Sequence, residues 1–220
     1  MMVKKISVTS HVSRDFLQSA SVFNTLPKVV WEYVSNSLDN GKEDTPTTVV
    51  VDIRTDENTL TVADNGSGMS RSDLENFFKM HGENVQRKKG KKVRGRFGTG
   101  KSAAFGIAKS LTIDTRQGGK RNVVSLNLDD IKRQISGNSF DVNEIAIDEA
   151  TNKEDGTIVE IKEFVTSRLD IETTIGYIEK HLARLHLRAN VLINGHTCKF
   201  KEPPVKHSIT VSAPLDIQQY

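Results

Sequence analysis

The sequence contains a single cysteine, Cys198, so no disulfide can form within the chain. It lacks any apolar run close to the roughly 20 residues that a membrane-spanning helix needs, and its first residues lack the apolar core of a signal peptide. These absences exclude a disulfide-stapled scaffold and a helical membrane protein. They predict a reduced, cytoplasmic chain with no membrane partner, in which Cys198 is a partly buried thiol without a catalytic role.

Neither the net charge nor the histidine content indicates a particular binding partner. The formal net charge is +3, too small by itself to predict a polyanionic partner. The six histidines are scattered, and His181 and His186 do not share a helical face. With 36% apolar residues among 220, the chain can bury one sizeable core. We expect one domain over residues 1–204 and an exit segment at 205–220, beyond which a second module could follow.

The first informative segment is a helix with polar residues gathered on one side. It is predicted to begin at Thr25, whose hydroxyl suits a cap, with Pro27 in the first turn, and to end at Asn40. Its apolar stripe consists of Leu26, Val30, Val34 and Leu38. The polar side chains on the other side are Glu32, Asn36 and Asp39. A helix that buries one face and gathers two acids and an amide on the other is suited to bind a ligand.

Two glycine-rich segments follow this helix. The first, Asp64-Asn65-Gly66-Ser67-Gly68-Met69, ends a predicted strand and permits close approach of the backbone. The second runs from Gly95 to Ser102 and fits the P-loop spacing Gly-x-x-x-x-Gly-Lys-Ser. A P-loop follows a buried strand, whereas residues 86–94 are mostly Lys and Arg. No apolar strand ending in a magnesium-binding Asp follows at a suitable distance, so we interpret the P-loop match as coincidental.

The remaining elements follow from hydrophobic periodicity and turn residues. We expect a strand-like stretch and a short helix within residues 1–22, and further helices at 70–80, 101–109 and 171–187. Strands are expected at 47–54, 58–63, 111–115, 121–128, 143–147, 157–161 and 191–193. The sum predicts an α+β fold, a two-layer sandwich of a mixed, mostly antiparallel sheet with helices on one face.

Taken in order, the three segments resemble the GHKL family of ATPases. This family includes gyrase-type topoisomerases, the ninety-kilodalton heat-shock chaperones, histidine kinases, MutL-type repair proteins and MORC ATPases. Its first motif is an acid followed four residues later by Asn and seven later by Asp, matched here by Glu32, Asn36 and Asp39. The second and third motifs are matched by residues 64–68 and 95–100.

A fourth, weaker motif, Gly-Thr-x-Val, is matched by residues 156–159. The resemblance spans roughly residues 20–200 and implies the Bergerat-type form of the α+β sandwich. It also implies an ATP hydrolase that needs Mg²⁺. Glu32 would be the general base, because an attacking water needs a proton acceptor within hydrogen-bond reach. Asn36 would offer Mg²⁺ a neutral oxygen, and Asp39 would support the purine end or orient the helix.

The second motif would bind the adenine ring. Asp64 would accept a hydrogen bond from the adenine amino group, and Gly66 and Gly68 would let the backbone pass close to the ring. Met69 would pack against the base or serve as an ordinary core residue. Thr157 would bring a hydroxyl to the adenine and its bound water, or be a plain strand residue.

The third segment would bind the phosphates, with backbone amides at the beginning of a helix. Its predicted ATP-binding residues are Arg96, Phe97, Gly98, Thr99, Gly100, Lys101 and Ser102. Lys101 replaces a hydrophobic residue of some relatives, and either contacts phosphate or is solvated. Residues 82–97 would form a lid. Seven of the eleven residues from 86 to 96 are basic, which fits a solvated loop, attraction to the triphosphate, or a nucleic-acid partner.

Three functions stay open at this point. In the first, ATP orders the lid and drives homodimerisation, or a partner completes the site, since the family's second module carries a further phosphate-binding lysine. The second is the catalytic domain of a sensor histidine kinase, and the third is a nucleotide-sensing module without turnover. Glu32 argues against both of these. Residues 35–37 resemble the chaperone branch, whereas residues 191–195 resemble the MutL or MORC branch.

Overall fold

The computed structural model describes residues 5–9, 13–78, 100–134, 139–167, 169–182 and 189–199. The strands are β1 (Lys5–Thr9), β2 (Thr47–Arg54), β3 (Thr59–Asp64), β4 (Ala108–Gln117), β5 (Lys120–Asn127), β6 (Ser139–Ala150), β7 (Gly156–Phe164), β8 (Ala189–Ile193) and β9 (His196–Thr197). The helices are α1 (Ser13–Ala20), α2 (Leu26–Asp39), α3 (Arg71–Phe78), the 3-10 helix η1 (Gly100–Gly106), α5 (Leu128–Arg133) and α6 (Ile171–Leu182).

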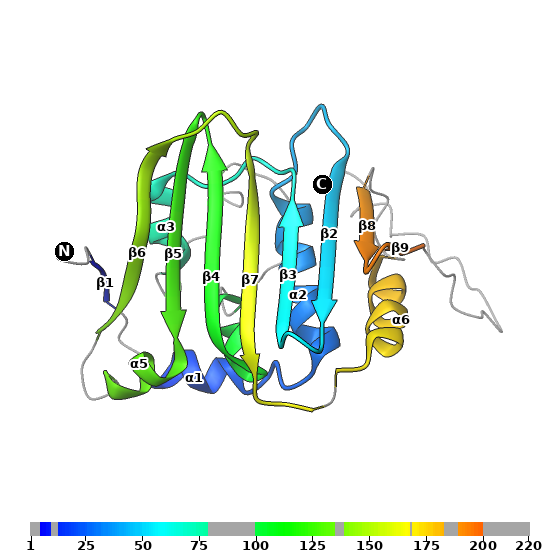
Figure 1. The fold of residues 1–220 in the computed structure, drawn as a ribbon, viewed down its shortest axis with the longest axis horizontal. Coiled ribbons are helices and arrows are strands. Elements are labelled where there is room, and N and C mark those ends of the chain that lie inside the picture. The colour runs from blue at the N-terminus through cyan, green and yellow to red at the C-terminus, as the bar shows by residue number, and fades with distance from the viewer. Residues whose placement is uncertain are drawn as a thin grey trace, which may run out of the picture.

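The strands of the described residues form one sheet in the order β1-β6-β5-β4-β7-β3-β2-β8-β9. β2 and β8 are parallel, and the other neighbouring strands are antiparallel. Helices α2 and α3 lie behind the sheet in the view of Figure 1. This arrangement confirms the predicted α+β class, with a mixed and mostly antiparallel sheet.

Alternation along the strands decides which face of the sheet is buried. In β2, Val49, Val51 and Ile53 are buried, whereas Val50 and Arg54 are exposed. The buried face packs against α2, whose predicted apolar stripe is buried throughout: Leu26, Val30, Val34 and Leu38. Burial of each such aliphatic side chain stabilises the fold by about 1.5–3 kcal/mol.

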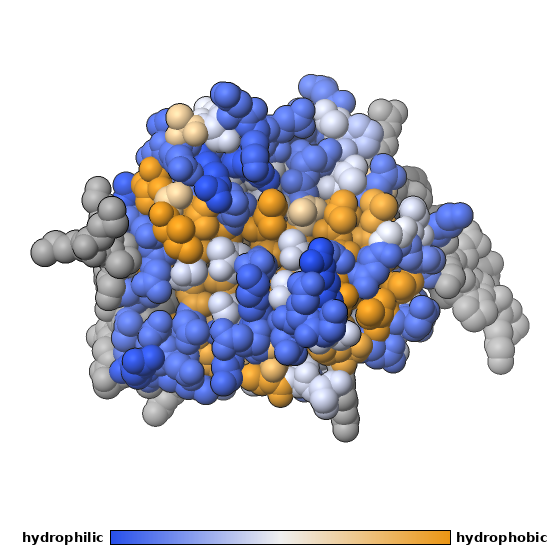
Figure 2. All heavy atoms as spheres, in the orientation of Figure 1, coloured by the Kyte–Doolittle hydropathy of each residue, from blue (hydrophilic) through white to orange (hydrophobic). Residues whose placement is uncertain are grey.

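The other face of the sheet faces the viewer in Figures 1 and 2 and is mainly polar, with separate groups of apolar side chains. Val50 on β2 and Ile145 on β6 are 44% and 63% exposed. Within the described ranges, no helix has the length and apolar content needed to cross a membrane.

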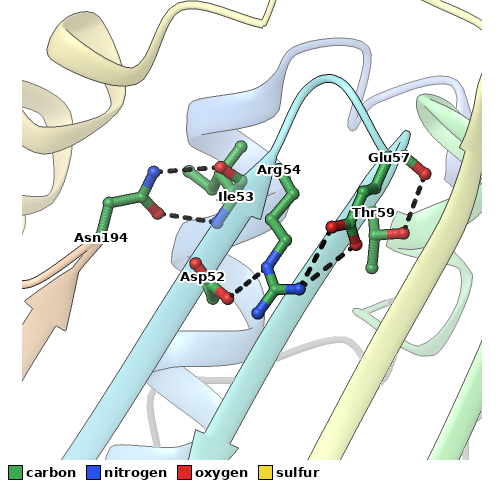
Figure 3. A network of polar contacts seen from close by, with 6 residues as sticks. All are labelled: Asp52, Ile53, Arg54, Glu57, Thr59 and Asn194. Atoms are coloured by element: carbon green, nitrogen blue, oxygen red, sulfur yellow. Dashed lines mark hydrogen bonds and ion pairs between the residues drawn. The ribbon is translucent and has the colours of Figure 1, made fainter.

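The parallel pairing of β2 with β8 ends in an Asn-Gly turn, as predicted for residues 194–195. Asn194 (φ 47°) and Gly195 (φ 79°) are both left-handed, which a two-residue hairpin turn between β8 and β9 requires. The Asn194 side chain then continues the ladder along β2 (Figure 3). Its Oδ1 accepts from the Ile53 N–H (2.7 Å), and its Nδ2 donates to the Ile53 carbonyl (3.0 Å). This amide therefore anchors the edge of the sheet.

The predicted helix over residues 101–109 is wrong. The segment forms the 3-10 helix η1 as far as Gly106, and Lys109 already lies in β4. Gly106 lies directly against the end of α1, where a Cβ would come within 2.6 Å of the Ala20 carbonyl oxygen. Because the chain meets α1 at this point, it turns and enters the sheet at Ala108.

Two predictions about helix ends are also wrong. Thr25 makes no side-chain cap bond, and Pro27 follows in the first turn without the N–H that a cap hydroxyl would bind. Leu128, predicted as the end of a strand, is the first residue of α5. Asn127 caps this helix by accepting from the Asp129 N–H (2.9 Å), a signal that the sequence interpretation missed.

The other predicted elements are present with adjusted bounds. The strands at 111–115, 143–147 and 157–161 lie within β4, β6 and β7, which continue further. Ser70 and Asp73 form the predicted capping box of α3, with bonds of 3.1 and 3.2 Å. The predicted helix at 171–187 is α6 as far as Leu182, and its last residues, like the exit segment at 205–220, lie outside the described residues.

Candidate nucleotide-binding site

The polar face of α2 brings the predicted base and the predicted magnesium ligand together. The Asn36 Nδ2 lies 3.5 Å from Glu32 Oε1, one helical turn away. Burial raises the pKa of Glu32, the nearby charge of Asp39 adds to this rise, and the Asn36 hydrogen bond opposes it. A carboxylate with a raised pKa is a stronger proton acceptor, so this helix face carries a group suited to general-base chemistry.

Asp64 lies at the end of β3, where three elements converge on its carboxylate. Its Oδ2 accepts from the Ser37 hydroxyl of α2 (2.7 Å). Its Oδ1 accepts from the Gly66 N–H (2.9 Å) and from the Thr157 N–H of β7 (3.2 Å). Burial raises the pKa of Asp64, whereas these bonds and the charge of Arg116 lower it. The carboxylate is therefore held in one orientation by α2, its own turn and β7.

The two glycines after Asp64 lie against protein backbone. A Cβ on Gly66 would be 2.7 Å from the carbonyl oxygen of Asn40, at the end of α2. Gly68 is left-handed (φ 64°), and a Cβ there would overlap the carbonyl oxygen of Arg116 on β4. The structure thus gives both glycines a packing role, and their approach to a nucleotide base stays a prediction.

Asn65 fixes the same turn to the beginning of β2. Its Oδ1 accepts from the Thr48 N–H (2.7 Å), and its Nδ2 donates to the Pro46 carbonyl (3.1 Å). The sequence interpretation assigned no role to this residue. Its position in an Asn-Gly pair at the end of a strand was the available signal.

A second group that the sequence interpretation missed is the hydroxyl of Thr115 on β4. It accepts from the Met69 N–H (2.8 Å) and lies 3.1 Å from the Thr157 hydroxyl. Thr115 is fully buried, although it continues the inward-facing series of Leu111 and Ile113. A polar residue at an inward-facing position of an apolar strand was the signal that could have identified it. Ser37, directly after the motif Asn, was missed in the same way.

The third segment is described only from Gly100 onwards. There, Tyr33 of α2 accepts a hydrogen bond from the Ala104 N–H (3.3 Å), which ties η1 to the same helix as Glu32. Ser102 in the same 3-10 helix is fully buried. The predicted site residues Arg96, Phe97, Gly98 and Thr99, the side chain of Lys101 and the lid at 82–97 lie outside the described part of the chain.

The described residues contain no cluster of three or more His, Cys, Asp or Glu side chains that could hold a metal. A protein-only metal cage is therefore absent from this part of the chain. The donor set instead fits Mg²⁺ that arrives with phosphate oxygens, because Asn36 directs its Nδ2 at Glu32 and keeps a carbonyl oxygen as a hard ligand. Cys198 is buried as predicted, and burial raises its pKa to about 11, so it carries little thiolate at neutral pH.

The mixed sheet, the polar face of α2 and the anchored Asp64 turn define a Bergerat-type α+β domain. A sequence profile described as "Histidine kinase-, DNA gyrase B-, and HSP90-like ATPase" matches residues 24–157, and the chain belongs to this family. The matched range includes every predicted site residue, from Glu32 to Thr157. No curated protein sequence matches the chain. The family relationship makes this an ATP-binding type of domain.

Proposed function

We propose that this chain binds ATP with Mg²⁺ and hydrolyses it slowly as an ATP-driven conformational switch. The observation that carries the proposal is the pairing of Glu32 with Asn36 on the face of α2 that Ser37 ties to Asp64. One helix thereby links a proton acceptor, a hard oxygen ligand and a buried hydrogen-bond acceptor. Glu32 would take the proton of the attacking water, a role that burial favours by raising its pKa.

Binding of the nucleotide would divide between two regions. Asp64 would accept from the adenine amino group, with Thr157, Met69 and the Gly66–Gly68 turn beside it and Asp39 supporting the purine end. The residues 96–102 would surround the phosphates. Bound Mg²⁺ would neutralise charge on the phosphate oxygens, and Asn36 is the residue that would hold it.

We further propose that residues 82–97 close over the nucleotide and that closure promotes dimerisation or docking of a partner that completes the site. The basic composition of 86–96 supports attraction to the triphosphate by charge. A nucleic-acid partner is a secondary proposal on the same residues. It would be abandoned if DNA and RNA affinities stayed unchanged after neutralisation of Lys88, Lys89, Lys91 and Lys92.

The central test measures ATP dissociation constants and steady-state hydrolysis, with Mg²⁺, for the parent and for Glu32→Gln. Loss of a general base lowers turnover by about 10²- to 10⁴-fold, and ATP binding should change by less than about threefold. Glu172→Gln is the matched control, since Glu172 is an exposed glutamate in the first turn of α6. It should leave both quantities unchanged.

The other outcomes of this test discriminate between the functions. A parent that binds ATP without turnover would favour the nucleotide-sensing module. Equal turnover by the parent and Glu32→Gln would remove Glu32 from the reaction, and absence of ATP binding would refute the proposal as a whole. Sedimentation with and without ATP then tests association. A monomer that hydrolyses ATP rapidly would contradict the switch.

A further inference from the structure

A buried hydroxyl on β4 connects the Asp64–Met69 turn with β7. Thr115 Oγ1 lies 2.8 Å from the Met69 backbone nitrogen, 3.1 Å from Thr157 Oγ1 and 3.5 Å from the Gly156 carbonyl oxygen. In the sheet register, Asp64 pairs with Thr157, and Thr157 pairs with Thr115. The three side chains therefore lie in one row across β3, β7 and β4. Thr115 has no role in the proposed binding and hydrolysis of ATP.

Either hydroxyl of the Thr115–Thr157 pair could donate across their 3.1 Å contact, and the distances favour one direction. A backbone N–H only donates, so Thr115 accepts from Met69 and keeps a single proton to donate. Its two acceptors are Thr157 Oγ1 at 3.1 Å and the Gly156 carbonyl at 3.5 Å. Hydroxyl bonds to oxygen are usually about 2.5–3.0 Å long. If Thr157 donated across the 3.1 Å contact, the Thr115 proton would have only the longer contact with the Gly156 carbonyl, so donation from Thr115 to Thr157 is favoured. Thr157 then accepts from Thr115, and its own proton is available to another acceptor.

Asp64, the neighbour of Thr157 in this row, presents a hydrogen-bond acceptor. Three donors contact its carboxylate: the Ser37 hydroxyl and the backbone N–H groups of Gly66 and Thr157. A carboxylate offers about four acceptor positions, so these bonds leave one position for a further donor. Thr157 and Asp64 thus stand side by side as a donor and an acceptor.

We propose that Thr115 is a positioning residue that makes Thr157 a hydrogen-bond donor and so sets the base preference of the site. The proposal rests on the proposed function, because it requires a nucleotide base beside Asp64. Adenine carries its amino donor next to a ring-nitrogen acceptor on both of its edges, N1 on one and N7 on the other. Guanine presents the O6 acceptor in place of the amino group. A donor next to an acceptor therefore fits adenine and rejects guanine.

The test compares dissociation constants for ATP, GTP, 1-deaza-ATP and 7-deaza-ATP in the parent, Thr115→Val and Thr115→Ser. We expect the parent to bind ATP about tenfold more tightly than GTP. It should also bind ATP more tightly than one of the two deaza analogues, namely the one that lacks the ring nitrogen to which Thr157 donates. In Thr115→Val, the penalty for that analogue should fall to about twofold or less. Thr115→Ser keeps the hydroxyl and should keep the penalty.

The ratio between analogues separates positioning from packing. A merely structural role would weaken binding of all four nucleotides by the same factor and leave every ratio unchanged, which would overturn the inference. If Thr115→Val does not fold, Thr157→Val removes the donor itself, and a deaza penalty that persists in that variant would also overturn the inference. A parent that binds ATP but shows no deaza penalty refutes this inference alone, whereas a parent that binds no ATP refutes the proposed function first.

Discussion

Removal of the Ser37 hydroxyl is expected to raise the pKa of Asp64 and to destabilise the fold above that pKa. Ser37 donates to Asp64 Oδ2 over 2.7 Å, and Ser37 is only 7% exposed. The bond favours the charged carboxylate, because it is one of the interactions that lower the pKa of Asp64 against the effect of burial. Ser37→Ala leaves the carboxylate in the same buried position with one donor fewer.

The magnitude follows from the type of bond. A hydrogen bond to a charged group contributes about 1.5–3 kcal/mol, and one pKa unit corresponds to about 1.4 kcal/mol. The pKa of Asp64 should therefore rise in Ser37→Ala, because the Ser37 hydrogen bond is one of the interactions that lower it. The free energy of unfolding should fall by about 1.5–3 kcal/mol at pH values where Asp64 is ionised in both proteins. The difference should shrink as the pH falls through the Asp64 pKa, because a protonated carboxyl gains less from the serine.

The assay combines carbon-detected NMR titration of the Asp64 carboxyl with urea unfolding at neutral and acidic pH. Ser35→Ala is the matched control. Ser35 is on the same helix and 5% exposed, but its hydroxyl donates to the Glu32 carbonyl within the helix (2.9 Å). It should leave the pKa of Asp64 unchanged and cost less than about 1 kcal/mol. Equal pKa values for Asp64 in the two variants would refute the argument that Ser37 holds the carboxylate.

Three further predictions concern backbone conformation, the sheet edge and pH. Gly68→Ala should destabilise the fold by more than about 2 kcal/mol in urea unfolding, since the added methyl group overlaps backbone and the residue is left-handed. The control Gly118→Ala, which is also left-handed (φ 59°) but has no neighbouring atoms at the added methyl group, should cost only about 1–2 kcal/mol. Asn194→Ala removes two hydrogen bonds to Ile53 and should lower the free energy of unfolding by about 1–2 kcal/mol. An unchanged free energy of unfolding would show that other contacts hold this end of β2. ATP turnover should fall as the pH drops through the Glu32 pKa, because only the ionised carboxylate accepts a proton. This fall in the pH profile should occur at a pH above the ordinary glutamate pKa, and it should be missing in Glu32→Gln.

The sequence alone determined the elements whose signals are local. The alternation in 47–54 and the apolar stripe of α2 predicted their buried faces, because side-chain direction repeats every two residues in a strand and every 3.6 in a helix. The same periodicity placed Glu32 and Asn36 together, since residues four apart on a helix are neighbours. The spacing along the chain thus predicted the family, which the matching sequence profile confirms.

Only the tertiary structure decided what holds the site in place. Ser37, Asp64 and Thr157 are far apart in sequence, and their bonds depend on the order in which β3, β7 and α2 pack. The early end of η1 has the same origin, because contact of Gly106 with α1 ends the helix where local propensity alone would continue it. Sequence periodicity specifies which face of an element is buried. It does not specify which partner that face meets, and the hydrogen bonds that orient Asp64 depend on that partner.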